Sequence, residues 1–90
     1  MAMVTKWKLD IDNAAGMLQA GAKRLDRGLG EVTVDFSCVS RIDARMAGAL
    51  EELADRAQEK GVQVTLCGVH VDVYKALKLA RLASRFSFSV

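Results

Sequence analysis

The fold of this chain is decided by residues 31–67, which read EVTVDFSCVSRIDARMAGALEELADRAQEKGVQVTLC. Apolar and polar side chains alternate over residues 31–37, the period-two pattern of a strand with one buried face. Asp43 then stands where a helix N-cap is expected, because a short side-chain oxygen can accept a free N–H of the first turn. Apolar residues recur at helical spacing up to Gly61, and residues 62–67 alternate again. This stretch therefore predicts a strand, a helix and a second strand.

The preceding segment continues this alternation of strands and helices. Residues 5–11 alternate between apolar and charged side chains, which predicts a strand with one solvent-exposed face. Asp12 or Asn13 is then expected to cap a helix, and Gly28 and Gly30 are expected to end it, because glycine readily adopts the positive φ of a helix C-terminus. The inward side chains expected for this helix are Ala14, Leu18, Ala22 and Leu25.

The C-terminal segment predicts one more helix and one more strand. Asp72 or a neighbour is expected to open the helix, and Phe86, Phe88 and Val90 alternate with serines in the expected strand. The inward side chains expected for the helix are Val73, Ala76, Leu77 and Ala80. The chain therefore reads β-α-β-α-β-α-β, an α/β fold with a mostly parallel four-stranded sheet and about three to four helices.

The strands predicted here differ from those of most parallel sheets, which are apolar on both faces. Each predicted strand has one apolar and one polar face. In the first strand, for example, Trp7 points to one face and Lys6 and Lys8 point to the other. Either the helices cover only one face of the sheet, or the polar face meets something else.

Length and composition describe one globular domain over residues 1–90. Of the residues, 51% are apolar and 27% are charged, and the net charge is only +2. Because basic residues are interleaved with acids, nucleic-acid binding is not expected. No apolar run approaches the roughly 20 residues that cross a bilayer, and the N-terminus lacks a secretory signal. We therefore expect a cytoplasmic protein without direct membrane insertion.

Residues that carry catalysis or bind metals are few and scattered. His70 has no partner at a metal-ligand spacing, and Cys38 and Cys67 follow no zinc motif, so no metal site is expected. The two cysteines are expected to be small buried hydrophobes. Neither a nucleophile with an orienting group nor a glycine-rich phosphate loop is found. We expect a protein that is not an enzyme and needs no cofactor.

The strongest local feature is the segment of residues 39–48, VSRIDARMAG. A strand ends, the chain turns, and Asp43 opens a helix whose N-terminal N–H groups face solvent. Such a helix start attracts anions and acidic side chains. By itself this is either a plain helix cap or a binding site for an acidic group.

Together with its surroundings this segment resembles the STAS family, which includes anti-sigma-factor antagonists and the cytosolic domains of sulphate transporters. The resemblance lies in the order and spacing of residues 34–36, 39–43, 59–61 and 64–69, and it covers nearly the whole chain. It implies a STAS-like fold and a non-catalytic, regulatory module that binds a partner protein. The residues implied in partner binding are Ser40, Arg41, Asp43, Ala44, Arg45, Met46 and Gly48.

The chain departs from the family pattern at two places. In the family, the hydroxyl residue that a partner kinase phosphorylates lies two places after the loop aspartate, where this chain has Arg45, and the preceding place is Ala44. Neither accepts phosphate, so no phosphosite is implied at the family position, and Ser40 and Ser37 are the nearby hydroxyls. The family's first strand is short or lost before Trp7, and an exposed sheet edge could then pair with another chain, as in a homodimer.

Three functions follow from the resemblance. The first is an anti-sigma-factor antagonist, whose partner is an anti-sigma factor of the kinase-like ATPase type. The second comes from residues 61–69 and 73–79, which resemble the small STAS subunit of phospholipid-transporting ABC systems of the Mla type and imply the transporter ATPase as partner. The third is a small-molecule sensor for nucleotides or lipids, since the positive helix start would suit a phosphate.

Overall fold

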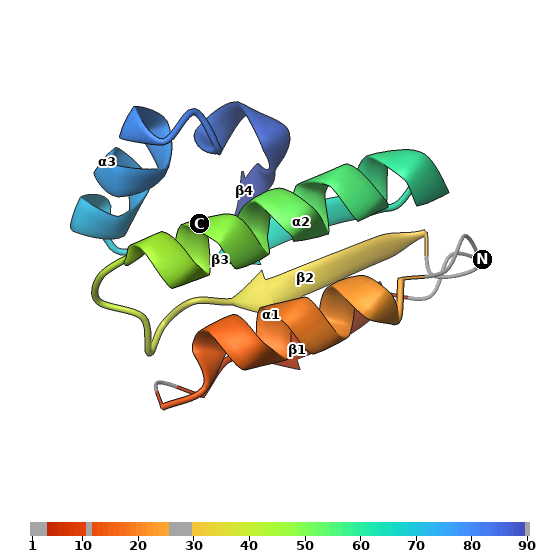
Figure 1. Cartoon of the computed structure of the whole chain (residues 1–90), viewed down its shortest axis with the longest axis horizontal. Helices are drawn as coiled ribbons and strands as arrows, with labels where there is room; N and C mark the ends of the chain where they lie inside the picture. Colours follow the sequence, from red (N-terminus) through yellow and green to blue (C-terminus); the bar gives the residue numbers. More distant parts are fainter. Residues whose placement is uncertain (1–3, 11, 26–29, 90) are drawn as a thin grey trace.

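In the described part of the chain, four parallel strands and three α-helices alternate, and a short 3-10 helix precedes the last strand (Figure 1). The computed structural model describes residues 4–10, 12–25 and 30–89. The elements are β1 (Val4–Lys8), α1 (Ala14–Lys23), β2 (Glu31–Asp35), α2 (Ala44–Lys60), β3 (Gln63–Cys67), α3 (Val71–Leu79), η2 (Ala83–Arg85) and β4 (Ser87–Ser89). The predicted α/β order β-α-β-α-β-α-β is confirmed.

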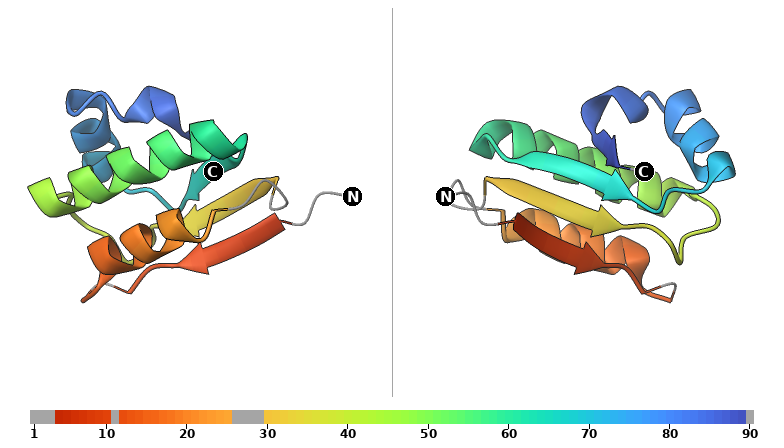
Figure 2. Two further views of the ribbon diagram at one scale, coloured as in Figure 1. Left: turned by 45° about the vertical axis from the view of Figure 1, so that its right-hand side comes forward. Right: turned by 180° about the vertical axis from the view of Figure 1, so that it is seen from behind.

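The strands lie in the order β1-β2-β3-β4, so each crossover moves one strand further in the same direction. Because βαβ crossovers are right-handed, this order places the helices on one face of the sheet. Figure 2 shows that α1 and α2 cover one face and that β1, β2 and β3 lie bare when seen from behind. The expectation that the helices cover only one face of the sheet is therefore confirmed.

The helix-facing side of the sheet carries the apolar side chains. Val32 and Val34 of β2 are in register with Val64 and Leu66 of β3, and all four are buried. The helices add inward residues, and those of α1 and α3 are ones that the spacing predicted. These are Ala14, Leu18, Ala22 and Leu25 in and after α1, Met46, Leu50, Leu53 and Ala57 in α2, and Val73 and Leu77 in α3. Removing this apolar surface from water is the main stabilising contribution to such a fold.

The opposite side of the sheet is polar in the described strands. In register across the strands, one row is Lys6, Thr33, Thr65 and Ser87, and the next is Lys8, Asp35, Cys67 and Ser89. Most of these side chains reach water, which satisfies their hydrogen-bonding groups. A parallel sheet with one polar face is therefore stable here without a second layer of helices.

The chain leaves β1 earlier than predicted. β1 ends at Lys8, and the Asp10 carboxylate accepts a hydrogen bond from the Asp12 N–H at 3.0 Å, which turns the chain toward α1. Ile11, the last residue of the predicted strand, lies outside the described residues. Asn13 is the N-cap residue of α1, but its side chain makes no capping hydrogen bond, so the predicted side-chain cap is wrong for Asn13.

The predicted glycine stops behave differently at the two helices. α1 already ends at Lys23, so the prediction that Gly30 ends it is wrong, and Gly30 with φ 68° instead leads directly into β2. Gly28 lies outside the described residues. At α2 the prediction is confirmed, because Gly61 is the C-cap in the left-handed conformation with φ 66°.

The C-terminal part contains a turn that the sequence pattern did not predict. α3 ends at Leu79, and Arg81 adopts a left-handed conformation with φ 60° before η2 begins. Ala80 is consequently exposed, so its predicted inward position is wrong. The last strand is present as β4, and Val90, its predicted end, lies outside the described residues.

Candidate functional site

The loops that follow β1, β2 and β3 gather at one edge of the sheet, because parallel strands have their carboxyl ends on the same side. The starts of α1, α2 and α3 therefore lie near one another. The His70 side chain, at the start of α3, places its Nε2 atom 3.0 Å from the Ser37 carbonyl oxygen in the loop after β2. This edge holds the 40–48 segment (residues 40–48), which the resemblance implies in partner binding.

A turn centred on Asp35 starts the loop. The Ser37 N–H donates a hydrogen bond to Asp35 Oδ1 at 2.8 Å, which stops β2 and directs the chain out of the sheet. Gly68, after the end of β3, passes close to this turn with φ 65°, and a Cβ atom there would lie 3.1 Å from Ser37 Cβ. The turn is thus held between the ends of two strands.

The Asp35 carboxylate should make stability depend on acid pH. The pKa of this carboxyl group lies below the ordinary value of 3.8, chiefly because the Ser37 backbone N–H and then the Ser37 hydroxyl donate hydrogen bonds to the carboxylate. The positive charges of Lys6 and Lys8 lower the pKa further. A lowered folded-state pKa stabilises the fold above 3.8 and loses that effect as the pH falls through the lowered value. We expect urea unfolding at neutral pH to give Asp35→Asn a lower free energy of unfolding than wild type. This gap in stability should disappear at acid pH. A constant gap would contradict this.

Asp43 fixes the start of α2. Its backbone is extended, with φ −97° and ψ 177°, and its Oδ1 accepts a hydrogen bond from the Met46 N–H at 2.8 Å. The predicted N-cap is confirmed. The first turn of α2 contains no acidic residue, and both Ala44 and Arg45 are exposed. The helix start therefore presents its positive dipole end together with one guanidinium to solvent.

Removing the Asp43 cap should lower stability moderately. We expect Asp43→Ala to reduce the free energy of unfolding by about 1 kcal/mol, because one N–H of the first turn loses its acceptor. Asp43→Asn is the matched variant, since its amide oxygen can accept the same bond. Urea unfolding of the three proteins measures both effects. An equal loss in both variants would mean that the charge, rather than the hydrogen bond, stabilises the helix start.

Two adjoining hollows lie beside the start of α2. One, of about 270 Å³, is lined by Ala14, Val39, Ser40, Arg41, Asp43 and Met46. The other, of about 140 Å³, is lined by residues 12–16, Asp43, Arg45 and Met46. Met46 is only 8% exposed, because it packs into the core, so it can contribute to a contact only as part of the lining of these hollows. The remaining predicted residues here reach the surface directly.

The start of α1 belongs to this surface and was missed from the sequence. Asp12, Asn13 and Gly16 line the smaller hollow together with Arg45. The signal that could have found them is the topology: two successive βαβ units in one direction place the N-terminal ends of their helices side by side at the same sheet edge.

A third hollow, of about 450 Å³, lies on the other side of α2. Ala44, Ala47 and Gly48 border it from α2, and Ala80 and Arg81 border it from the end of α3. A Cβ atom on Gly48 would meet nothing within 4 Å, so the surface of α2 is open at this point. The predicted residues Ala44 and Gly48 thus face a different hollow from Ser40 and Arg41.

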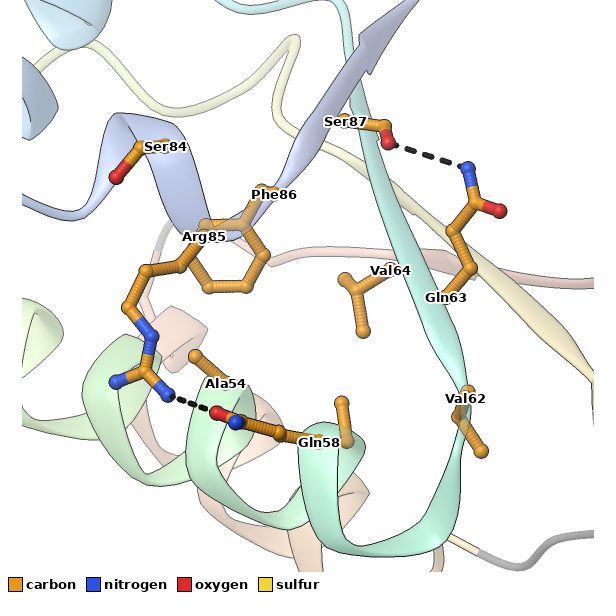
Figure 3. Close-up of a pocket in the computed structure, with 10 residues that line it drawn as sticks. Ala54, Gln58, Val62, Gln63, Val64, Ser84, Arg85, Phe86 and Ser87 are labelled. Carbon is orange, nitrogen blue, oxygen red and sulfur yellow. Dashed lines mark hydrogen bonds between the residues drawn. The ribbon is translucent and has the colours of Figure 1, made fainter.

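A separate cavity of about 390 Å³ lies between the second half of α2, the start of β3 and the chain entering β4 (Figure 3). Its apolar lining is Ala54, Ala57, Val62, Val64 and Phe86. Polar groups at its border are bonded to one another. Arg85 Nη2 donates to Gln58 Oε1 at 3.2 Å, and Gln63 Nε2 donates to Ser87 Oγ at 3.1 Å. No residue of this cavity was predicted as part of a site.

The residues considered for metal or nucleophile chemistry lie near the carboxyl ends of β2 and β3, where His70 contacts the residue before Cys38. Cys67 is partly buried, but Cys38 is exposed because it follows Ser37 in the turn after β2, so the prediction that it is a buried hydrophobe is wrong. Within the described ranges, no three His, Cys, Asp or Glu side chains are placed to hold a metal ion. In the same part of the chain, no helix is long and apolar enough to span a membrane.

Comparison with known proteins identifies the family of this chain. The family model of the STAS domain matches residues 2–89. The chain belongs to the STAS family. No curated protein matches it in sequence.

The STAS domain is also similar to solved structures. A crystal structure of a candidate anti-sigma factor antagonist from Thermotoga maritima has a TM-score of 0.70 and 20% identity, and the alignment covers 93% of this chain and 72% of the other. The NMR structure of that protein gives a TM-score of 0.69 and 18% identity, covering 96% and 70%. At these identities the likeness supports the fold of the STAS domain.

Proposed function

We propose that this STAS domain is a non-catalytic regulatory module that docks on a partner protein through the 40–48 segment and the exposed face of α2 beside it. The partner is an anti-sigma factor of the kinase-like ATPase type, and the domain acts in the cytoplasm as an anti-sigma-factor antagonist. The observation that carries the proposal is the exposed Arg45 in the first turn of α2, where the family pattern has a phosphorylatable hydroxyl.

Arg45 and Arg41 are the groups near the helix start that would contact acidic side chains of a partner, and they lie beside the exposed carboxylates of Asp43 and Asp12. The helix dipole leaves partial positive charge on the free N–H groups, and Arg45 adds a full positive charge beside them. Arg41 is exposed in the preceding loop and adds a second. The Asp43 carboxylate accepts a hydrogen bond from the helix itself. Complementary charges of this kind raise the association rate and select among partners.

Regulation in this proposal does not use phosphorylation at the family position. A phosphate there would add about two negative charges at a helix start and repel an acidic partner. Ala44 and Arg45 have no hydroxyl, so binding is governed by the amounts of the two proteins. Ser40 and Ser37 are the nearby hydroxyl residues, and both are exposed.

Reversing the charge of Arg45 tests the docking surface. We expect Arg45→Glu to weaken binding to the partner by about tenfold or more, with much of the loss in the association rate at low salt. The tagged wild type is first purified from its native cells, and the captured anti-sigma factor is identified by mass spectrometry. Affinity and rates are then measured by surface plasmon resonance at two salt concentrations.

Lys60→Glu is the matched control, because it makes the same charge change at the exposed far end of α2. An equal loss in both variants, or in neither, would contradict docking through the 40–48 segment. Capture of a transporter ATPase and its permease, in place of an anti-sigma factor, would favour the alternative of an accessory subunit in a phospholipid-transporting ABC system.

A second candidate function is small-molecule sensing, and the cavity in Figure 3 is the observation that favours it. Its size is within the usual range for small ligands, and it combines an apolar lining with the polar groups of Arg85, Gln58 and Gln63. A ligand that binds only the folded state raises the melting temperature. A thermal shift with GTP, ATP or a fatty acid would support this function, and a flat response to all three would remove it.

A further inference from the structure

Two aromatic side chains lie exposed beside each other at the C-terminal end of the sheet. Tyr74 of α3 is 40% exposed and Phe88 of β4 is 36% exposed. Their rings meet edge to face, with centroids 5.1 Å apart and an interplanar angle of 77°. They border a hollow of about 500 Å³ whose other lining residues are Lys78, Arg81, Ala83 and Ser84.

The strand next to this hollow has a free edge. β4 is the last strand in the sheet order and pairs with β3 alone among the described strands. Its residues, Ser87, Phe88 and Ser89, carry no charge. The opposite edge differs, because β1 contains Lys6 and Lys8, and edge lysines discourage the addition of another strand. β4 contains no lysine, although it is a short edge strand of three residues.

The hollow is also bordered by positive charge. Lys78 and Arg81 line it, and among the described residues no acidic side chain does. The two ion pairs between described residues involve Arg56 and Arg85, so neither Lys78 nor Arg81 takes part in them. Tyr74 and Lys78 lie four positions apart on one side of α3, and Arg81, beyond the end of the helix, lines the same hollow.

We propose that β4 and this hollow form a second docking site, which binds an extended acidic segment of a partner protein by strand addition. Backbone groups of the segment pair with the free edge of β4. An apolar side chain enters the hollow that Tyr74 and Phe88 border, and carboxylates on either side of it meet Lys78 and Arg81. This combination of main-chain pairing with a side-chain pocket is a general mode of peptide recognition.

Charge disfavours a second copy of the chain as the occupant. Pairing two β4 edges would bring Lys78 and Arg81 of both copies toward each other, and pairing β4 with β1 would add Lys6 and Lys8 to the same region. Like charges brought together in an interface oppose association. An acidic segment from another protein meets neither obstacle.

A synthetic peptide provides the test. The probe is fluorescein-labelled Glu-Asp-Val-Leu-Val-Asp-Glu, whose two Asp and one Leu side chains share one face when the peptide is extended. We expect saturable binding in fluorescence anisotropy, and we expect Lys78→Glu combined with Arg81→Glu to weaken it by about tenfold or more. The same peptide with N-methylated backbone should not bind, since it keeps the side chains but loses the strand pairing.

Controls separate this site from the 40–48 segment and from general charge effects. Lys23→Glu combined with Lys60→Glu makes the same change in net charge elsewhere and should leave peptide affinity unchanged, as should Arg45→Glu. If circular dichroism shows that the double variant does not fold, Lys78→Ala alone replaces it in the binding measurement. Unchanged affinity of the Lys78 variants, or equal binding of the N-methylated peptide, overturns the proposal. So does self-association, or binding to anionic phosphatidylglycerol vesicles, in the absence of peptide binding.

Discussion

Leu50→Ala is expected to lower the free energy of unfolding by about 2–5 kcal/mol. Leu50 is 0% exposed, and it lies in the inward stripe of α2, the longest helix, which covers the apolar face of the sheet (Figure 1). The substitution removes buried methyl groups and leaves a cavity that the rigid neighbours cannot fill. A domain of this size has only about 5–15 kcal/mol of stability, so the variant should lose a large fraction of it.

Urea unfolding followed by circular dichroism measures this loss, with the free energy extrapolated to water. Glu51→Ala is the matched control, because Glu51 is the next residue of α2 and is exposed. A surface substitution of this kind should change stability by no more than about 0.5 kcal/mol. If the two variants were equally stable, Leu50 could not lie in the core as described.

Gly68→Ala is expected to be destabilising by about 2–5 kcal/mol, the sum of two effects. The left-handed conformation, φ 65°, disfavours a side chain by about 1–2 kcal/mol. In addition, the new Cβ would lie 3.1 Å from Ser37 Cβ and 3.2 Å from the Ser37 backbone nitrogen. Relieving that contact requires the turn at Asp35 to move, which should cost about 1–3 kcal/mol more.

Gly61→Ala isolates the first effect, because Gly61 has φ 66° and a Cβ there would meet nothing within 4 Å. We expect this control to lose only about 1–2 kcal/mol in the same unfolding experiment. The difference between the two variants then measures the close packing of Gly68 against the loop before the 40–48 segment. Equal losses would show that this packing contributes nothing.

Local patterns predicted the elements because each depends on residues near one another in sequence. Asp43 caps α2 and Gly61 ends it, as the residue types and their spacing indicated. The predictions failed where the backbone turned at a residue whose effect the periodic pattern does not show. Asp10 turns the chain before the predicted end of the first strand, and Arg81 adopts a conformation that the residue type does not indicate.

The candidate sites were predictable only in part. The 40–48 segment could be read from the sequence because it is continuous and starts at a recognisable cap. The hollow bordered by Tyr74 and Phe88 could not, because these residues come from α3 and β4, and the edge position of β4 follows from the strand order. The same holds for the contribution of Asn13 and Gly16 to the hollow beside Arg45.

By itself the sequence determined the order of the main strands and helices and the apolar side of most of them, because the periods of two and 3.6 residues reflect local backbone geometry. It also determined that positions 44 and 45 carry no hydroxyl. Only the tertiary structure decided that one face of the sheet stays bare, that two helix starts share a surface, and that β4 forms an edge. These features depend on the order of the strands in the sheet, which sets the contacts between residues distant in sequence.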